Sequence, residues 1–357
     1  MSTDITINKP KPINIGEKQL NQFNHTSKIS NTITLLETGT PILINEFYSD
    51  GLLLLKALQL HLEKEYPNKS FKEQRDYRTA YHNLSNLILI KIEDYTLAVK
   101  KAPAIGWLKK LYPETTNFVL AFPQVQGLNS AWQWYKNGIS ISVLRNKIHP
   151  YYGTYFPTRF DHLILFDNWL KRYKGSKKSA IDVGVGSGVL SFQMIQNGFQ
   201  KVFATDTNPN AIVGLTEAIQ GTKLARKIEL DFGHLFGKWK NKTELIIFNP
   251  PWLPETQSSN KIDQAIYYNE KLFPDFFTEA KKRLLPDGKL IILFSNLAQI
   301  TNVSKNHPIE EELEKEARFQ LEKCLKKTVK AASNKTKRDQ HWRSTEKVEL
   351  WILNNKK

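Results

Sequence analysis

The sequence predicts an α/β fold with a mainly parallel sheet, preceded by an N-terminal α+β domain. From Ala180 onward, short runs of β-forming apolar residues alternate with stretches of helical periodicity, which is typical of a parallel sheet covered by helices. The first run leads directly into a glycine-rich turn, as at the carboxyl end of a strand beside a ligand. The six predicted strands are AIDVGV, KVFATD, KIELDF, ELIIFNP, KLIILFS and VELWIL.

The N-terminal part is predicted to combine a helix with a hairpin. Residues 51–66 are apolar and then amphipathic, and Asp50 before them and Pro67 after them are good helix start and stop signals. Near 131–144, polarity alternates on both sides of an Asn-Gly pair, which favours the tight turn of a β-hairpin.

A connector separates the two predicted domains. Residues 145–165 mix Pro, Gly and aromatic side chains, so we predict an N-terminal domain at 1–150, a candidate for substrate recognition, and a second domain at 151–357. Within the second domain, residues 309–330 predict a charged helix, and the basic stretch 331–347 predicts a loop before the last strand.

The composition indicates a soluble globular protein with a basic surplus. The 357 residues include 51 Lys and Arg against 35 Asp and Glu, a net charge of +16. This surplus favours a polyanionic partner such as nucleic acid, and a solvated Lys-rich surface explains it equally well. No apolar run is long enough to span a bilayer, and the N-terminus lacks the order of a secretory signal. Cys324 is the only cysteine, which excludes an intrachain disulfide and a cysteine-based zinc site. We therefore expect a cytoplasmic protein with no metal site and no membrane contact, whereas the oligomeric state cannot be predicted.

The glycine-rich turn predicts a nucleotide-type site. In AIDVGVGSGVL the spacing is G-x-G-x-G, whereas the dinucleotide fingerprint requires glycine where Val189 stands. Asp206 ends the next predicted strand, where a carboxylate can accept hydrogen bonds from both ribose hydroxyls or can cap the following helix. Asp182 is either a structural anchor of the turn or a partner for a ligand's ammonium group. The candidate ligand-binding residues here are Asp182, Gly184, Gly186, Gly188 and Asp206.

A second turn, Asn249-Pro250-Pro251-Trp252, follows the predicted strand ELIIF directly, so both turns should leave the same edge of the sheet. The side-chain oxygen of Asn249 and the carbonyl of Pro250 can each accept one N–H of a planar amide or amine and orient its nitrogen. Pro250 and Pro251 restrict the turn, and Trp252 offers a flat face for stacking. Alone, this motif could be an ordinary strand breaker beside a core Trp. Together with the glycine-rich turn, it favours a catalytic site.

With these motifs, residues 150–300 resemble class I S-adenosylmethionine methyltransferases of the methyltransferase small domain group, which is related to glutamine-N5 and ribosomal-RNA guanine methyltransferases. DVGVGSG resembles the first motif of that family, Asp206 its ribose-binding acid, and NPPW its catalytic turn. The resemblance implies a Rossmann-like sheet, mainly parallel with an antiparallel last strand, and S-adenosyl-L-methionine as the cofactor.

The resemblance adds two further segments. GTYFPTRFDHLIL is similar to the segment that closes over cofactor and substrate in the family, which makes Phe156, Pro157 and Arg159 pocket candidates, although a plain core-and-turn role is equally open. The family often carries Gly-Asp-Leu-Phe, with the Asp at the adenine amine, where this chain has Gly-His-Leu-Phe. His234 is therefore a candidate for the adenine contact, and Asp231 is a displaced substitute.

The predicted function is an S-adenosylmethionine-dependent N-methyltransferase that acts on a planar amide or exocyclic amine. The net charge favours an RNA base, free or in a ribonucleoprotein. Alternatives are a protein glutamine-N5 methyltransferase, a small-molecule methyltransferase, a nicotinamide-dependent oxidoreductase, or a non-catalytic RNA-binding module on a methyltransferase fold. In the N-terminal part, aromatic side chains form either a nucleic-acid stacking platform or a core. These are Trp107, Trp132, Trp134 and Tyr135.

Overall fold

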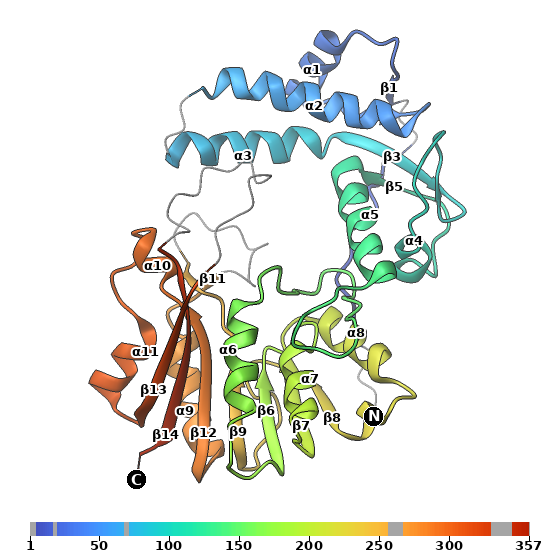
Figure 1. Ribbon diagram of the computed structural model, residues 1–357. Coiled ribbons are helices and arrows are strands. Elements are labelled where there is room, and N and C mark those ends of the chain that lie inside the picture. Colours follow the sequence, from blue (N-terminus) through green and yellow to red (C-terminus); the bar gives the residue numbers. More distant parts are fainter. Residues whose placement is uncertain (1–4, 17–19, 68–70, 256–266, 330–344, 357) are drawn as a thin grey trace. The chain divides into compact units, whose positions relative to one another are not determined.

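Figure 1 shows the computed structural model, which describes residues 5–16, 20–67, 71–255, 267–329 and 345–356. The chain splits into two compact units, the N-terminal unit (Ile7–Asn137) and the sheet unit (Met1–Thr6 with Gly138–Lys357). This division lies ahead of the predicted boundary at residue 150. The reason is that Ile139 and Ile148, which both precede residue 150, belong to the core of the sheet unit. Within the described ranges, no helix has both the length and the apolar character needed to cross a membrane.

The N-terminal unit is built on a small mixed sheet. Its strands are β1 (Asn21–Phe23), β2 (Ile42–Ile44), β3 (Ile88–Glu93), β4 (Thr96–Leu97) and β5 (Phe118–Ala121). Its helices are α1 (Ile29–Glu37), α2 (Tyr48–Glu65), α3 (Phe71–Ser85), α4 (Trp107–Leu111) and α5 (Phe122–Asn137). Strands β1, β2 and β3 pair in parallel, whereas β4 and β5 both run antiparallel to β3. The predicted α+β character of this part is therefore confirmed.

Helix α2 confirms the helix predicted at 51–66 but begins earlier. Its N-cap position is Phe47, so Asp50 lies inside the first turn and is not the N-cap. The Oδ2 atom of Asp50 accepts a hydrogen bond from the Phe47 backbone N–H at 3.0 Å. Asp50 thus satisfies an amide in front of the helix, as the acid of a capping box does.

The β-hairpin predicted near 131–144 is wrong, because its first half belongs to α5. Trp132 and Tyr135 are three residues apart on this helix, and their ring centroids lie 5.6 and 4.6 Å from that of buried Trp107. Gly138 has φ +68° and follows the last residue of the helix, where glycine commonly ends helices. The Asn-Gly pair therefore terminates a helix, and Trp107, Trp132 and Tyr135 form a packed aromatic cluster.

Among the described residues, the large sheet of the sheet unit has seven strands in the order β13-β14-β12-β9-β6-β7-β8. These are β6 (Ser179–Val183), β7 (Lys201–Asp206), β8 (Ile228–Phe232), β9 (Thr243–Phe248), β12 (Leu284–Ser295), β13 (Phe319–Thr328) and β14 (Lys347–Asn355). Five of them pair in parallel, and β14 runs antiparallel to both β12 and β13. The mainly parallel Rossmann-like sheet with an antiparallel last strand is thus confirmed. A separate pair of short strands joins β10 (Leu253–Pro254) to β11 (Tyr267–Tyr268).

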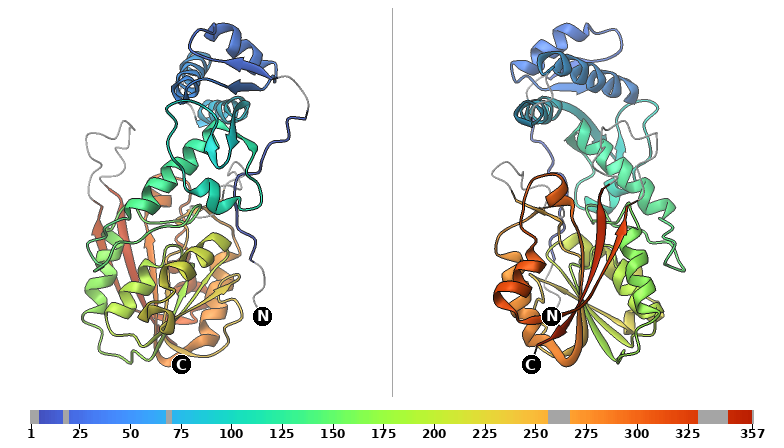
Figure 2. Two further views of the ribbon diagram at one scale, coloured as in Figure 1. Left: turned by 90° about the vertical axis from the view of Figure 1, so that its right-hand side faces the viewer. Right: turned by 60° about the vertical axis from the view of Figure 1, so that its left-hand side comes forward.

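Helices cover both faces of this sheet (Figure 2). They are α6 (Asp161–Leu170), α7 (Val189–Gln196), α8 (Pro209–Ile219), α9 (Leu272–Arg283), α10 (Leu297–Ile300) and α11 (Pro308–Glu311), with short turns η1 (Lys223–Arg226) and η3 (Glu312–Glu316). Along β9, Leu245 and Ile247 join the core under α6, α7 and α8, whereas Ile246 and Phe248 join the core under α9. A strand that is buried on both faces has a continuous apolar sequence, which explains why β9 could be predicted from the sequence.

The charged helix predicted at 309–330 is wrong over most of its length. Only the segments to Glu316 are helical, and Phe319–Thr328 form the edge strand β13. Its Lys and Glu residues are the charges that protect an exposed strand edge from pairing with another chain. Of the loop predicted at 331–347, residues 331–344 lie outside the described residues.

Glu349 on β14 is the centre of a buried polar cluster. Its Oε2 atom accepts hydrogen bonds from His307 Nε2 at 3.1 Å and Trp351 Nε1 at 2.9 Å, and its Oε1 atom pairs with Lys326 Nζ at 2.8 Å. Burial by itself raises the pKa of this carboxyl, but the hydrogen bonds and the nearby charges outweigh it and lower the pKa to about 2.

We expect Glu349→Gln to flatten the acid dependence of stability. A folded-state pKa below the unfolded value of about 4.3 stabilises the protein above that pH, and this contribution is lost as the pH falls toward 2. It amounts to about 3 kcal/mol. Urea unfolding between pH 6 and pH 2.5 should therefore show a smaller loss for Glu349→Gln than for the wild type. The exposed Glu229→Gln is the control, and equal losses in all three proteins would contradict the assignment.

Candidate active site

The register of three parallel strands brings the two predicted turns together. Val183 at the end of β6 pairs with Phe248 of β9 on one side and with Thr205 of β7 on the other. The residues that follow these three are Gly184, Asn249 and Asp206. All three therefore leave the sheet side by side at its carboxyl edge.

The glycine-rich turn has a backbone that only glycine adopts easily. Gly184, Gly186 and Gly188 have φ values of +71°, +50° and +82°. A Cβ atom on Gly186 would lie 3.1 Å from the Tyr155 carbonyl oxygen, and one on Gly188 would lie 2.8 Å from a methyl carbon of Leu215. The turn then enters α7 directly. Glycine at these positions therefore lets the turn pack closely against Tyr155 and Leu215.

Asp206 ties the turn to β7. Its Oδ2 atom accepts a hydrogen bond from the Gly186 N–H at 2.8 Å, and its Oδ1 atom accepts one from the Asn208 N–H at 2.8 Å. Burial raises its pKa against the effect of these hydrogen bonds. The residue that caps α8 is Asn208, whose side-chain oxygen accepts from the Asn210 N–H. The capping role considered for Asp206 therefore belongs to Asn208.

Asp182 lies under the turn and is fully buried. Its Oδ2 atom accepts a hydrogen bond from the Ser191 hydroxyl at 2.6 Å, but its Oδ1 atom has no hydrogen-bond partner among the described residues. Burial raises the pKa of Asp182 to about 7, although the Ser191 hydrogen bonds lower it, and the charge of Asp206 adds to the rise. Asp182 is thus both an anchor for α7 and a buried acid with one unused oxygen.

The NPPW turn is held by its own tryptophan. Trp252 Nε1 donates a hydrogen bond to Asn249 Oδ1 at 3.2 Å, and the half-buried Trp252 ring packs against the core under α9. This donor leaves one lone pair on the Asn249 amide oxygen, because a carbonyl oxygen accepts two hydrogen bonds.

His162 stands beside this turn, and the sequence motifs did not indicate it. Its ring lies edge-on to the Trp252 ring, with centroids 5.5 Å apart and an interplanar angle of 87°. The residue is only 2% exposed, and neither ring nitrogen has a hydrogen-bond partner among the described residues. Burial lowers its pKa to about 4, against a smaller effect of Asp161. Each unmet buried polar group costs about 1–3 kcal/mol, so His162 is expensive to keep. The only signal in the sequence is its place in FDHLIL, within the segment already considered for the pocket.

The segment ahead of α6 runs along the glycine-rich turn. The carbonyl oxygens of Tyr152 and Gly153 accept hydrogen bonds from the side chains of Asn210 and Asn208 at 2.7 and 2.8 Å, beside Asp206. Arg159 is paired through its guanidinium with the buried Glu346 at 2.6 Å. Two further candidates, Phe156 and Pro157, are partly buried against the core and fully buried, respectively. Their contact with a substrate stays a prediction.

His234 is exposed on the turn after β8 and lines a groove of about 260 Å³ together with α9 residues that include Asp275 and Glu279. Asp231, the alternative candidate for the adenine contact, is paired with Lys238. Lys238 Nζ lies 3.0 Å from Asp231 Oδ1, and the Lys238 backbone N–H donates a hydrogen bond to Asp231 Oδ2 at 2.9 Å. A contact between His234 and an adenine therefore also stays a prediction.

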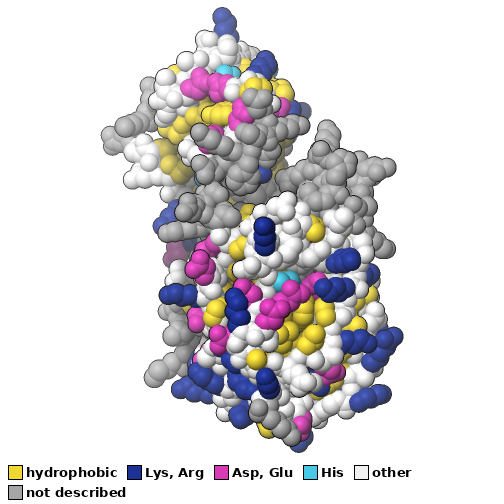
Figure 3. Space-filling model, turned by 90° about the vertical axis from the view of Figure 1, so that its left-hand side faces the viewer, with side chains coloured by type: hydrophobic (Ala, Val, Ile, Leu, Met, Phe, Trp, Pro, Cys, Tyr) yellow, Lys and Arg dark blue, Asp and Glu magenta, His cyan; other side chains and the backbone are white. Residues whose placement is uncertain are grey.

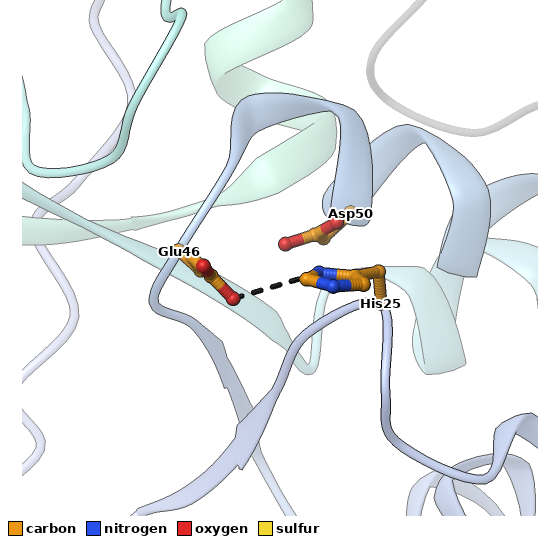
Figure 4. Close-up of side chains that lie close together, drawn as sticks. All are labelled: His25, Glu46 and Asp50. Atoms are coloured by element: carbon orange, nitrogen blue, oxygen red, sulfur yellow. Dashed lines mark ion pairs between the residues drawn. The ribbon is translucent and has the colours of Figure 1, made fainter.

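Among the residues that the structure describes, two groups that could hold a metal ion lie in the N-terminal unit, and neither includes a predicted site residue. His25 Nδ1 lies 3.5 Å from Glu46 Oε2, and the Asp50 carboxylate faces them (Figure 4). Asp50 is engaged with the Phe47 N–H, and Lys100 Nζ approaches Glu46 Oε1 to 4.0 Å. In the second group, half-buried His61 bridges the exposed Glu37 and Glu65. Ordinary ion pairs and capping account for both groups.

Comparison with known proteins shows what the sheet unit is similar to. The family model of the methyltransferase small domain matches residues 163–323. The chain is 28% identical over 193 residues to a Methanocaldococcus jannaschii protein named for protein N5-glutamine methylation, and this match covers 51% of the chain and 92% of the relative. It is 30% identical over 80 residues to the ribosomal protein L11 methyltransferase of Exiguobacterium sibiricum, which covers 22% and 25% of the two chains. A solved ribosomal protein L11 methylase from Lactobacillus delbrueckii matches with 18% identity, coverage of 57% and 82%, and a TM-score of 0.38.

We expect Asp182→Asn to remove a pH dependence of stability of opposite sign to that of Glu349. A folded-state pKa of about 7 lies above the unfolded value of about 3.9, so the contribution is present below pH 4 and is lost as the pH rises through 7. The full change is on the order of 4 kcal/mol. The difference in unfolding free energy between Asp182→Asn and the wild type should therefore shift in favour of the variant from pH 4 to pH 8. A difference that stays constant over this range would contradict the raised pKa.

Proposed function

We propose that this chain is an S-adenosylmethionine-dependent methyltransferase and that it methylates a planar amide nitrogen. The match of residues 163–323 to the methyltransferase small domain model supports the proposal. The observation that carries the proposal is the register of Val183 with Phe248, which sets the NPPW turn beside the glycine-rich turn. A methyl donor held at one turn and an acceptor nitrogen held at the other would meet at this edge of the sheet.

The residues at the glycine-rich turn fit S-adenosylmethionine. The positive φ angles of Gly184, Gly186 and Gly188 give a tight turn at the end of a strand, of the kind that a nucleoside and an amino-acid group can approach closely. Asp206 has lone pairs left for ribose hydroxyls, and the unused Oδ1 of Asp182 suits the ammonium group. When bound, the cofactor supplies an electrophilic methyl group on a sulfonium. All of these assignments to single residues are part of the proposal.

The NPPW turn fits an acceptor –NH₂ group. In an amide the lone pair of this nitrogen is delocalised. It would have to localise on nitrogen as the new N–C bond forms and the S–C bond of the cofactor breaks, with the electron pair of that bond leaving on sulfur and one N–H proton passing to solvent. Asn249 Oδ1 and the Pro250 carbonyl can each accept one N–H and hold the nitrogen in the reactive orientation. The two prolines restrict the backbone, so these two oxygen atoms are already in place before the amide to be methylated arrives.

The amide of a protein glutamine is the acceptor class that we favour. The relative named for protein N5-glutamine methylation aligns over 92% of its own length. Basic side chains around α6 are also occupied by acids, because Arg159 pairs with Glu346 and Lys327 Nζ lies 2.8 Å from Asp161 Oδ1. On the face in Figure 3, acidic side chains of the sheet unit likewise lie among the basic ones. These pairs leave less free positive charge for a phosphate backbone.

An RNA base is the second candidate because of the net charge of +16. The decisive experiment is incubation of the purified chain with cofactor tritiated on its methyl group and with lysate from a strain that lacks the protein. Label that protease releases and nuclease does not supports the glutamine amide. Nuclease-sensitive label would move the acceptor to RNA, and absence of macromolecular label would contradict both classes.

We expect Asn249→Ala to separate binding from catalysis. Loss of one positioned hydrogen-bonding group should reduce label transfer by roughly 100-fold or more, by analogy with other preorganised sites. Cofactor affinity measured by calorimetry should stay within about two-fold, because Asn249 lies on the acceptor side. Asn241→Ala, at an exposed position ahead of the same strand, is the matched control and should keep full activity. Undiminished turnover of Asn249→Ala would remove this residue from the mechanism.

A further inference from the structure

His162 is a buried, uncharged imidazole next to the proposed acceptor turn, and the mechanism above gives it no role. Its ring nitrogens lack partners among the described residues, and its low pKa keeps it neutral at physiological pH. A neutral imidazole carries one N–H donor and one acceptor nitrogen. His162 therefore has an unused N–H donor and an unused acceptor nitrogen, and its ring carries no charge.

The position of His162 links it to both turns. The next residue, Leu163, accepts a hydrogen bond through its carbonyl from Gln193 Nε2 at 2.9 Å, and Gln193 lies on the helix that follows the glycine-rich turn. The His162 ring itself contacts Trp252, the last residue of the NPPW turn. Helix α6 thus carries this imidazole to the NPPW turn.

A purely structural role does not explain the imidazole. Phenylalanine has a similar shape, would keep the edge-on contact with Trp252, and would leave no polar atom unsatisfied. By contrast, buried His307 uses its Nε2 to hold Glu349. An unmet polar group kept at a cost to stability is typical of a site that a ligand completes.

We propose that His162 is a binding residue of the acceptor pocket and that it hydrogen-bonds the carbonyl oxygen of the acceptor amide once Trp252 turns aside. This inference rests on the proposed function. A primary amide has two N–H groups, which Asn249 and Pro250 would accept, and one carbonyl oxygen, which needs a donor. The same rotation of the Trp252 side chain breaks the hydrogen bond that it donates to Asn249 Oδ1. One movement therefore uncovers the N–H donor of His162 and frees the second lone pair of Asn249 Oδ1.

The test compares His162→Phe with His307→Phe and His162→Gln. If His162 binds the acceptor, His162→Phe should melt at the wild-type temperature or a few degrees above it, whereas His307→Phe should melt several degrees lower. Cofactor affinity should stay within about two-fold. The apparent KM for the acceptor, measured by titrating the lysate fraction that takes up label, should rise roughly ten-fold or more with kcat little changed, as for an interaction equal in ground and transition states. His162→Gln keeps a donor and should recover much of this loss.

Two outcomes would overturn the proposal and differ from a failure of the proposed function. If His162→Phe melts as low as His307→Phe, the imidazole is a core group. If His162→Phe keeps the wild-type KM for the acceptor, the imidazole nitrogens of His162 do not bind the acceptor. A wild-type chain that transfers no label contradicts the proposed function instead, and the melting temperatures then still decide whether His162 is a structural core group.

Discussion

The in-register parallel pairing of β6 with β9 is the constraint on which the candidate active site depends. Because Val183 lies opposite Phe248, the glycine-rich turn and the NPPW turn begin at the same height. A slip of one residue would move Asn249 by about 3.3 Å and would reverse the side chains of β9. Such a slip is costly, since Ile247 and Phe248 belong to cores on opposite faces of the sheet. The hydrophobic packing therefore fixes the distance between the two turns.

The sequence was sufficient to predict six of the seven strands of this sheet, because these six are short and mainly apolar runs. It was not sufficient where a short pattern fits two periods. The stretch before Asn137 alternates like a strand, but Trp132 and Tyr135 also lie one helical turn apart, and packing on Trp107 decides for the helix. Strand β13 shows the opposite error. Its charged residues look like the surface of a helix in the sequence, but the segment pairs with β14 and forms an edge strand.

The candidate site divides in the same way. Residues that lie within a motif, such as Gly186 and Asn249, could be predicted because their chemistry is local in sequence. Residues whose environment comes from distant segments could not. In the sequence nothing near Arg159 indicates an ion-pair partner, because its partner Glu346 is 187 residues away. His162 likewise gains its significance only when burial removes its solvent and Trp252 lies against it.

Burial changes the pKa values of the buried groups beside the two turns in opposite directions. It raises the pKa of Asp182 and lowers that of His162, since in each case it disfavours the charged form. Under the proposed function, a cationic cofactor beside Asp182 would favour its carboxylate, so charge would be balanced on the donor side. His162 would stay neutral, so the acceptor side would hold no opposing charge. Methyl transfer from a sulfonium to a neutral nitrogen spreads positive charge in the transition state. A buried, uncharged acceptor side next to an anionic donor side suits that change, because fixed dipoles rather than mobile water then surround the reacting nitrogen.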